Sequence, residues 1–367
     1  PMTSPRALRR PAPLAGLAAL TLLGTAIAQQ PVSPADRTDL EGSSYTHYPL
    51  GRASCRMQTL HGDLPGGTVL TGHAYRRDAI GVRGRIDGLA VEVQVTASVS
   101  NALPGGASTT FANNRGSNPV VVLPRTWVAL PATDRPSLDP APAFELVLPW
   151  TTPFTMPPQG GTLCLEVEVF GNQGTLGTNR NVSLYLDAHE LYTDGRCEQP
   201  GFRFGQGCAA PGSSRDCYAN LSLWHRGTHM NLDVALRDAI PDRGNGLARA
   251  FVALGLGLGS SAFPTAPQCT LFSSAELVLP LAAAVSSTGS CDDTFVGMPV
   301  LPPGFRLWAQ AGAIDLGNGN LTLGDVSGIA TPPPGLTPVP CARVVDANNV
   351  TGTTGTLSLA VPVIRFL

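Results

Sequence analysis

Apolar and polar residues alternate in several short stretches of this chain. In residues 91–99 every odd position is Val or Ala and every even position is polar. Residues 163–170 show the same period, with one face formed by Leu163, Leu165, Val167 and Val169 and the other by Cys164, Glu166, Glu168 and Phe170. A period of two residues is typical of a half-buried β-strand. We therefore predict strands at both stretches.

Three weaker patterns are also interpreted as strands. Apolar residues alternate within residues 232–239, and Pro280 argues against a helix in residues 274–285. Residues 253–259 are predicted to form a glycine-rich strand. With 41 glycines and 34 prolines, the chain is expected to contain many short strands joined by turns. This predicts an all-β fold of two antiparallel β-sandwich domains, of jelly-roll or immunoglobulin-like type.

The first 28 residues have the three parts of a secretory signal peptide. Three arginines precede an apolar run over residues 14–28, which ends in the small-residue site Ala26-Ile27-Ala28. The run is shorter than the roughly 20 apolar residues that span a bilayer. We expect cleavage after Ala28, no membrane span in the mature chain, and a protein that is secreted or held at the cell surface.

The mature chain is longer than a single sandwich usually is, which predicts two domains. The boundary is placed near residues 195–205, where the alternation lapses and turn residues accumulate. The predicted order is a flexible leader (29–42), β-sandwich domain 1 (43–195), β-sandwich domain 2 (202–330), a proline-rich connector (331–340) and C-terminal strands that pack on a sandwich (341–367).

The charge of the chain excludes several classes of function. The formal net charge is −2, and all 24 basic side chains are arginines. A mildly acidic chain without a basic patch is not expected to bind nucleic acid. Without lysine, a P-loop, a Schiff base and a lysine general base are all impossible. We expect no cofactor.

Eight cysteines are spread along the chain, at positions 55, 164, 197, 208, 217, 269, 291 and 341. None forms a C-x-x-C pair, which zinc ribbons and thioredoxin-type redox sites require. An even number of cysteines in an exported chain is typical of structural disulfides. The stretch with Cys197, Cys208 and Cys217 is therefore interpreted as a connection between two domains that is held by disulfides, and we expect no metal site.

Three motifs carry weak catalytic or metal-binding hypotheses. Glu166 and Glu168 would share a strand face, like the paired carboxylates of a glycosidase, but a solvated sheet face explains them better. His225 and His229 have the spacing of zinc ligands on a helix, whereas a strand would hold them about 13 Å apart. Residues 315–325 offer oxygens to calcium but lack the order of an EF-hand loop, and a hairpin with an Asn-Gly turn is favoured.

The tryptophans are the best candidates for ligand binding. Trp308 alternates onto the polar face of its predicted strand, together with Arg306 and Gln310, and Trp224 shares a face with Arg226. An aromatic ring beside such polar groups can stack on the apolar face of a sugar. The competing interpretation is that both rings pack under a loop or against the other domain.

Two sections of the chain contain recognisable fragments: Arg56-MQTLHG, Leu70-TGHAYRRD, Thr109-TFANNRG, Phe144-ELVLPWTTPF, Gly161-TLCLEVEVFGN, Phe204-GQGC, Pro267-QCTLFSSAELVLPL, Phe305-RLWAQAGAID and Leu321-TLGDVSG. In these fragments and their order the chain resembles secreted bacterial β-sandwich proteins, from Planctomycetes and related bacteria, which have no assigned function. The resemblance implies β-sandwich domains outside the cell and a family-like bridge between Cys208 and Cys269. It implies no catalytic residue.

The other bridges are a hypothesis from order and domain placement. Eight cysteines allow 105 connectivities. Besides the family-like bridge, the predicted pairs are Cys55–Cys164, Cys217–Cys291 and Cys197–Cys341.

These observations predict a secreted or cell-surface structural or binding protein that has no catalytic activity and is stabilised by disulfides. Its partners would be an extracellular glycan or other envelope proteins. Two alternatives stay open. One is a module that binds carbohydrate through surface tryptophans, and the other is a secreted hydrolase of unknown type.

Overall fold

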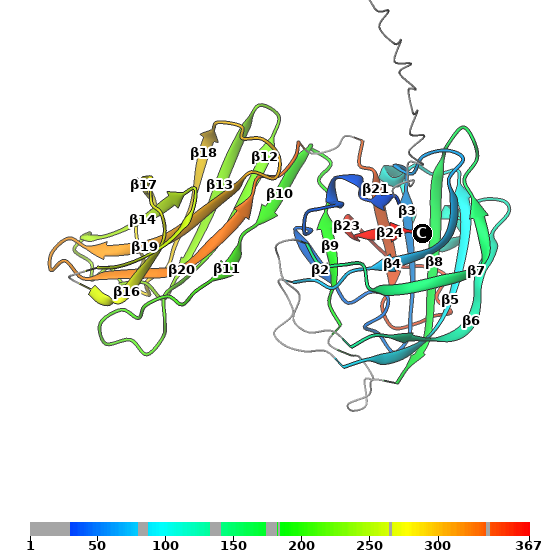
Figure 1. The fold of residues 1–367 in the computed structure, drawn as a ribbon, viewed down its shortest axis with the longest axis horizontal. Coiled ribbons are helices and arrows are strands. Elements are labelled where there is room, and N and C mark those ends of the chain that lie inside the picture. Colours follow the sequence, from blue (N-terminus) through cyan, green and yellow to red (C-terminus); the bar gives the residue numbers. More distant parts are fainter. Residues whose placement is uncertain are drawn as a thin grey trace, which may run out of the picture. The chain divides into compact units, whose positions relative to one another are not determined.

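The described residues fold almost entirely into antiparallel β-strands (Figure 1). The computed structural model describes residues 30–79, 87–132, 141–173, 182, 184–263, 266–334 and 338–367. The predicted signal peptide lies outside these residues. The helical elements among them are a single short α-helix and two 3-10 turns: α1 (Phe111–Asn114), η1 (Ala35–Arg37) and η2 (Pro104–Gly106). The prediction of an all-β chain is confirmed.

The largest sheet has six strands and combines both ends of the described chain. Its order is β22 (Thr356–Ser358), β21 (Cys341–Asp346), β3 (Cys55–His61), β8 (Thr162–Asn172), β5 (Leu89–Ser100) and β6 (Val120–Leu130). Strand β21, near the C-terminus, therefore pairs directly with β3, near the N-terminus. Figure 1 shows β21 alongside β3 and β8.

Two smaller sheets join the same segments of the chain. One contains β1 (Val32–Ser33), β24 (Ile364–Phe366), β4 (Val69–Tyr75) and β7 (Leu146–Thr155). The other contains β2 (Ser44–Thr46), β9 (Leu186–Glu190) and β23 (Ala360–Pro362). The final strands β23 and β24 thus pair with β9 and β4.

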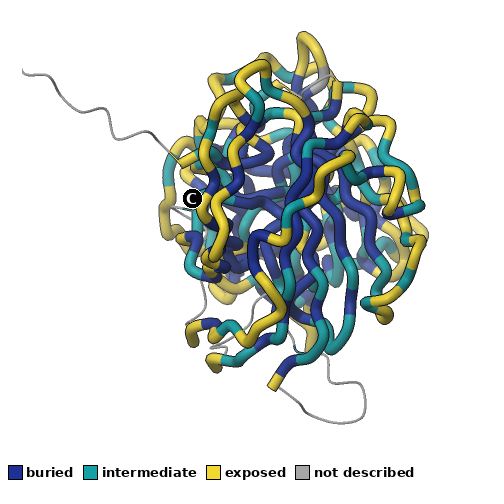
Figure 2. Tube along the Cα trace, turned by 90° about the vertical axis from the view of Figure 1, so that its right-hand side faces the viewer, coloured by how far each residue is buried: buried dark blue, intermediate teal, exposed yellow. Residues whose placement is uncertain are grey.

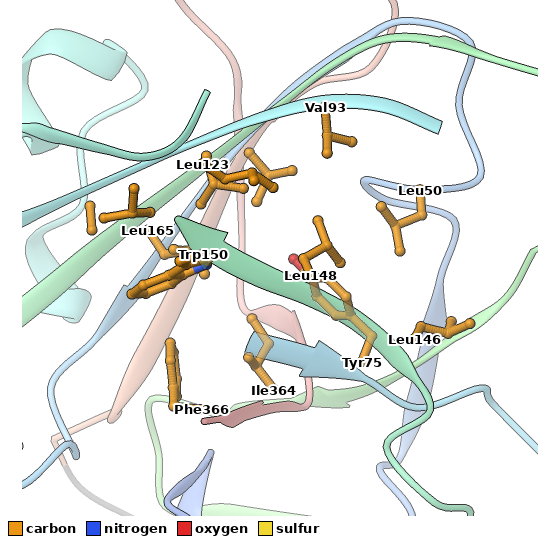
Figure 3. Packing of buried hydrophobic residues seen from close by; sticks show 14 of the residues in the cluster. Leu50, Tyr75, Val93, Leu123, Leu146, Leu148, Trp150, Leu165, Ile364 and Phe366 are labelled. Atoms are coloured by element: carbon orange, nitrogen blue, oxygen red, sulfur yellow. The ribbon is translucent and has the colours of Figure 1, made fainter. Parts of the chain in front are cut away.

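The alternating residues of these sheets form one hydrophobic core (Figure 3). The odd positions of β5 from Val91 to Ala97 are fully buried in it, as the period of two predicts. Ile364 and Phe366 of the last strand pack near Trp150 in the same cluster. Burial of one such side chain contributes about 1.5–3 kcal/mol to folding, so the C-terminal strands contribute directly to this core.

Strands from residues 196–330 pair only with one another. A four-stranded sheet has the order β10 (Arg196–Pro200), β12 (Tyr218–Arg226), β13 (His229–Arg237) and β18 (Cys291–Met298). A five-stranded sheet has the order β11 (Phe202–Phe204), β20 (Leu321–Ala330), β19 (Arg306–Asp315), β14 (Ala248–Gly255) and β17 (Leu277–Pro280). Strands β15 (Leu258–Phe263) and β16 (Ala266–Ser273) form a two-stranded sheet.

Gly201 is the point at which the chain passes from one of these sheets to the other. Strand β10 before it pairs with β12, and β11 after it pairs with β20. A Cβ atom at Gly201 would lie 2.7 Å from Ser327 Cβ and 2.8 Å from Ile329 Cγ1. Only glycine therefore fits without displacing β20. The residues predicted to form a domain joint are strands of these two sheets.

A second hydrophobic core belongs to residues 217–329. Leu221 and Leu223 of β12 and Val252 of β14 are buried in it. Strand β19 contributes the small side chains Ala309, Ala311 and Ala313, which leave room for the leucines of the neighbouring strands. Figure 2 shows the buried residues concentrated along the strands and the exposed ones gathered in the connecting loops.

Most predicted strands are confirmed, and two predictions are wrong. Residues 232–239 lie mainly in β13, and residues 274–285 contain the short strand β17. Residues 253–259 do not form one strand, because β14 ends at Gly255 and β15 begins at Leu258. The leader at residues 29–42 is not flexible where it is described, because it forms β1 and η1 and buries Arg37 completely.

Candidate functional site

Trp308 lies on the five-stranded sheet between two glycines. Gly255 of β14 and Gly328 of β20 are its partners across the sheet. A Cβ atom at Gly328 would come within 2.9 Å of the Trp308 ring. The ring stands edge-on to Phe202, with 5.5 Å between ring centroids, and Arg306 lies over Phe202 at 5.4 Å. Trp308 and Arg306 are therefore brought together with Phe202, and Trp308 is half-buried.

Gln310 does not face a ligand, contrary to the prediction. Its side chain is fully buried. Its Oε1 accepts hydrogen bonds from the backbone N–H groups of Phe272 (2.7 Å) and Ser273 (3.4 Å). Its Nε2 donates to the carbonyls of Thr270 (3.0 Å) and Gly324 (2.8 Å). The polar face of β19 is covered by β16 at this position, so Gln310 connects strands instead of binding a ligand.

Trp224 lies apart from Trp308, on the four-stranded sheet. It is opposite Glu198 of β10, and the Arg196 guanidinium lies 5.2 Å from its ring centroid. Arg196 also donates to Glu198 Oε2 at 2.7 Å and covers the Tyr192 ring at 4.4 Å. The Trp224 ring is thus part of an internal cation–π stack. The side chain of Arg226 lies outside the described residues.

Trp127 is the exposed tryptophan that the sequence interpretation missed. It lies on β6 and its side chain is 50% exposed. Glu92 of β5 is opposite Trp127, and Gly171 of β8 is opposite Glu92. Arg125 of β6 donates two hydrogen bonds of 2.9 Å to the Glu92 carboxylate, one from Nε and one from Nη2. The alternation that places Arg125 and Trp127 on one face of residues 120–130 would have identified this group.

Glu166 and Glu168 do not form a solvated face. Glu166 is 1% exposed and accepts hydrogen bonds from Arg115 Nε (3.0 Å), Arg56 Nη2 (3.3 Å) and the Gln58 amide. Burial and the neighbouring Glu166 raise the pKa of the half-buried Glu168. Two arginines therefore hold Glu166, which is a structural arrangement and leaves no open carboxylate pair for glycoside hydrolysis.

The histidine pair and the acidic loop have structural explanations. His225 and His229 belong to adjacent strands of a tight hairpin, so they are not i and i+4 on one strand as the 13 Å estimate assumed. His225 is buried, and burial lowers its pKa, whereas His229 is exposed. Asp315 begins a hairpin turn: its backbone N–H donates to Asn320 (2.9 Å) and its Oδ1 accepts from Gly317 N–H (2.8 Å).

The structure contains the disulfide between Cys208 and Cys269 and holds the other six cysteines as buried thiols. The register rules out Cys55–Cys164, because Cys164 lies opposite Leu60 and Cys55 opposite Val169. Five residues of strand separate the two cysteines, about 17 Å, whereas bridged Cα atoms lie within about 7 Å.

The other two predicted bridges are also absent. Cys217 immediately precedes β12, and Cys291 lies on β18, so the whole width of β13 separates them. Two strand spacings amount to about 9–10 Å, which is too far for a bridge. Cys197 and Cys341 are both thiols with separate polar partners.

Two of these thiols lie in buried polar clusters. Arg37 Nη2 donates to Cys197 Sγ (2.7 Å) and approaches His189 Nε2 (3.1 Å). Burial raises the pKa of Cys197 to about 11 and, together with the Arg37 charge, lowers that of His189 well below its usual value. Both groups are therefore neutral near pH 7. The positive charge of Arg37, within hydrogen-bond distance of both side chains, opposes binding of a metal cation to this cluster.

Ser33 is the centre of the second cluster. Its Oγ lies 2.7 Å from His61 Nδ1 and 3.0 Å from Cys341 Sγ, and it donates to Asp63 Oδ1 at 2.6 Å. His61, Ser33 and Cys341 are fully buried. The hydroxyl satisfies all three neighbours, so the cluster is complete as a hydrogen-bond network.

Comparisons with family models, with curated proteins and with solved structures find no match for this chain. The resemblance to secreted planctomycete proteins therefore stays a prediction. Among the residues that the structure describes, none of the helices has the length and apolar character needed to cross a membrane.

Proposed function

We propose that this protein is an exported structural or binding protein of two β-sandwich domains, without catalytic activity. One domain would comprise residues 31–190 with the C-terminal strands, and the other residues 196–330. The sheets support this division, because strands β10–β20 pair only among themselves in the described chain. The separate hydrophobic clusters of the two segments support it as well.

The observation that carries the proposal is the use of ionisable side chains as internal connections. Glu166 is neutralised by Arg56 and Arg115, and buried Asp325 binds Arg203 and the Ala219 N–H. Groups held in this way have no freedom to bind or transfer protons to a substrate. They stabilise strands, as expected for a scaffold whose surface provides the function.

Export is tested by expressing the full chain in a bacterial host and separating cytoplasm, envelope and medium. We expect the protein in the envelope or the medium, with an N-terminus at Gln29. Substitution of Leu20→Arg within the apolar run should keep the chain in the cytoplasm at its full length. An unprocessed cytoplasmic wild-type chain would refute export.

Glycan binding is the second candidate, favoured by the surface around Trp127. The half-exposed ring lies beside the Arg125–Glu92 pair, so stacking and hydrogen-bonding groups occur together. Trp308 is less exposed than Trp127, and Phe202 stands edge-on against its ring. Trp127 is therefore a better candidate than the tryptophans chosen from the sequence.

A glycan array followed by tryptophan fluorescence tests this candidate. If a saccharide binds, Trp127→Phe should weaken binding and remove most of the fluorescence response. The matched variant Trp308→Phe should leave both unchanged. Silence across a broad array, or loss of the response only in Trp308→Phe, would reject the Trp127 surface.

A further inference from the structure

A hollow of about 700 Å³ lies at one edge of the six-stranded sheet, over β21 and β22. Tyr48, from the loop after β2, also lines it. This edge is opposite the one formed by β6, which carries Trp127. The hollow is therefore separate from the Trp127 surface. Its polar lining residues are Arg343, Asp346, Asn348, Thr354, Thr356 and Ser358.

Arg343 is a buried cation in the lining of this hollow, with its side chain on β21. The residue is only 8% exposed. Its Nη1 donates to Thr46 Oγ1 at 2.7 Å, and its Nη2 donates to Ser358 Oγ at 3.1 Å. Its Nε is buried and has no hydrogen-bond partner among the described residues. No carboxylate in that part of the chain pairs with the guanidinium, whose partners are two neutral hydroxyls. A buried charge in this state is costly until an anion joins it.

A second guanidinium increases the positive charge beside the hollow. The Cζ atoms of Arg343 and Arg52 lie 5.5 Å and 4.7 Å from the centroid of the Tyr48 ring. Arg52 Nη2 donates to Tyr48 Oη at 3.0 Å, and its Nε is likewise buried without a partner in the described chain. Burial also lowers the pKa of Arg343, because it disfavours the charged form. An anion next to Arg343 would compensate this charge.

Asp346 lines the same hollow but does not neutralise Arg343. Three positions of β21 separate the two residues, which places their Cα atoms about 10 Å apart. Asp346 Oδ1 accepts a hydrogen bond from Asn348 N–H at 3.3 Å. The hollow therefore offers a positive group and, at a distance from it, a hydrogen-bond acceptor. A ligand with one anionic group and several hydroxyls matches this arrangement.

We propose that the hollow binds a uronic acid residue of an acidic glycan, with the sugar carboxylate on Arg343. A guanidinium matches the planar carboxylate with two parallel N–H donors. The hydroxyls of Thr356 and Ser358 can both donate to and accept from sugar hydroxyls. Asp346 can accept from a sugar hydroxyl, and its charge repels a second anionic group, which disfavours polyphosphates and densely sulfated chains.

The wild-type protein provides the first test. Sodium glucuronate, galacturonate and mannuronate are each added in a calorimetric titration at low salt. We expect at least one of them to bind one per chain with a Kd of about 10⁻⁴–10⁻³ M. Its methyl ester, which lacks the charge, should bind at least about tenfold more weakly. Sodium sulfate and a hexapeptide of glutamate should both bind more weakly than that uronate.

Two variants locate the bound carboxylate. Arg343→Gln should weaken uronate binding at least about tenfold, and without ligand it should melt at or above the wild type because an unpaired buried charge is gone. Ser358→Ala removes a hydroxyl that holds Arg343 Nη2 and should weaken binding about threefold or more. The matched control Arg215→Gln alters an arginine side chain that is 78% exposed and should keep the wild-type affinity. Trp127→Phe should also keep it, so this site and the Trp127 surface can fail independently.

Four results would overturn the proposal. The first is that none of the three uronates binds the wild type up to about 10 mM. The second is equal binding of the methyl ester, which would remove the carboxylate from the interaction. The third is tighter binding of sulfate or of the glutamate peptide than of every uronate. The fourth is unchanged uronate affinity in Arg343→Gln or, if that variant does not fold, in Ser358→Ala.

Discussion

Replacement of Gln310 with methionine tests whether a buried amide connects the sheets of the 196–330 segment. Methionine matches glutamine in length and volume but has no strong hydrogen-bonding groups. The change leaves the backbone N–H of Phe272 and the carbonyls of Thr270 and Gly324 without their partners. It does so without creating a large cavity.

The expected loss follows from these three contacts. A buried polar group without a partner costs about 1–3 kcal/mol. Phe272 and Thr270 are half-buried, so water can replace part of what is lost there. The lower end of the range then applies to each group. The free energy of opening around β16, β19 and β20 should fall by about 3 kcal/mol, which is roughly a 150-fold change in an equilibrium constant.

Hydrogen exchange measured by mass spectrometry resolves this loss by segment. Peptides covering residues 306–330 should exchange roughly 150-fold faster in Gln310→Met. Peptides covering residues 55–61 should be unaffected, because β3 belongs to the other hydrophobic core. The matched control Gln206→Met removes an exposed amide that bonds Asp216 and should change exchange by less than about threefold. If the two variants behave alike, the structural role of Gln310 is refuted.

Three further predictions concern stability. The double variant Cys208→Ser, Cys269→Ser removes a disulfide between residues 61 positions apart. The free energy of unfolding, measured with denaturant, should fall by about 4 kcal/mol, and an unchanged unfolding midpoint would contradict this. Burial lowers the pKa of His61 and His73 from the ordinary histidine value of 6.5 to about 3. Between these two pH values, only the unfolded chain binds a proton at each histidine. Stability is then intact above pH 6.5 and should fall by about 1.4 kcal/mol per pH unit for each histidine as the pH drops from 6.5 towards 3; a flat profile over that range, measured by urea unfolding, would show that these histidines titrate normally. Gly201→Ala should destabilise the 196–330 segment by about 1–3 kcal/mol, and thermal melting without a loss of that size would refute the close packing there.

The strands could be predicted because their signal is local. Alternation in residues 91–99 and 163–170 depends only on which face meets a core, and the structure buries the apolar face in both. That the polar face of residues 163–170 is also covered could not be predicted in the same way. Glu166 is buried by Arg56 and Arg115, and no local pattern reveals that arginines from two other segments lie above it.

Long-range pairing explains the remaining errors. Of the four predicted disulfides, Cys208–Cys269 is present in the structure. Cys55–Cys164 is wrong because strand register decides which cysteines face one another, and cysteine spacing does not reveal the register between β3 and β8. The proximity of the buried carboxyl groups of Glu41, Asp78 and Asp187 was not predicted, because these residues are far apart in sequence. Gln310 was assigned to a surface because alternation cannot show that β16 covers the polar face of β19.

The measurement that tests the proposed export most directly is mass spectrometry, with non-reducing peptide mapping, of the protein recovered from outside the cytoplasm. The account predicts a mature chain that begins at Gln29, in which Cys208 and Cys269 are linked and Cys55 and Cys164 are not paired with each other. A full-length, fully reduced chain that remains in the cytoplasm would contradict it.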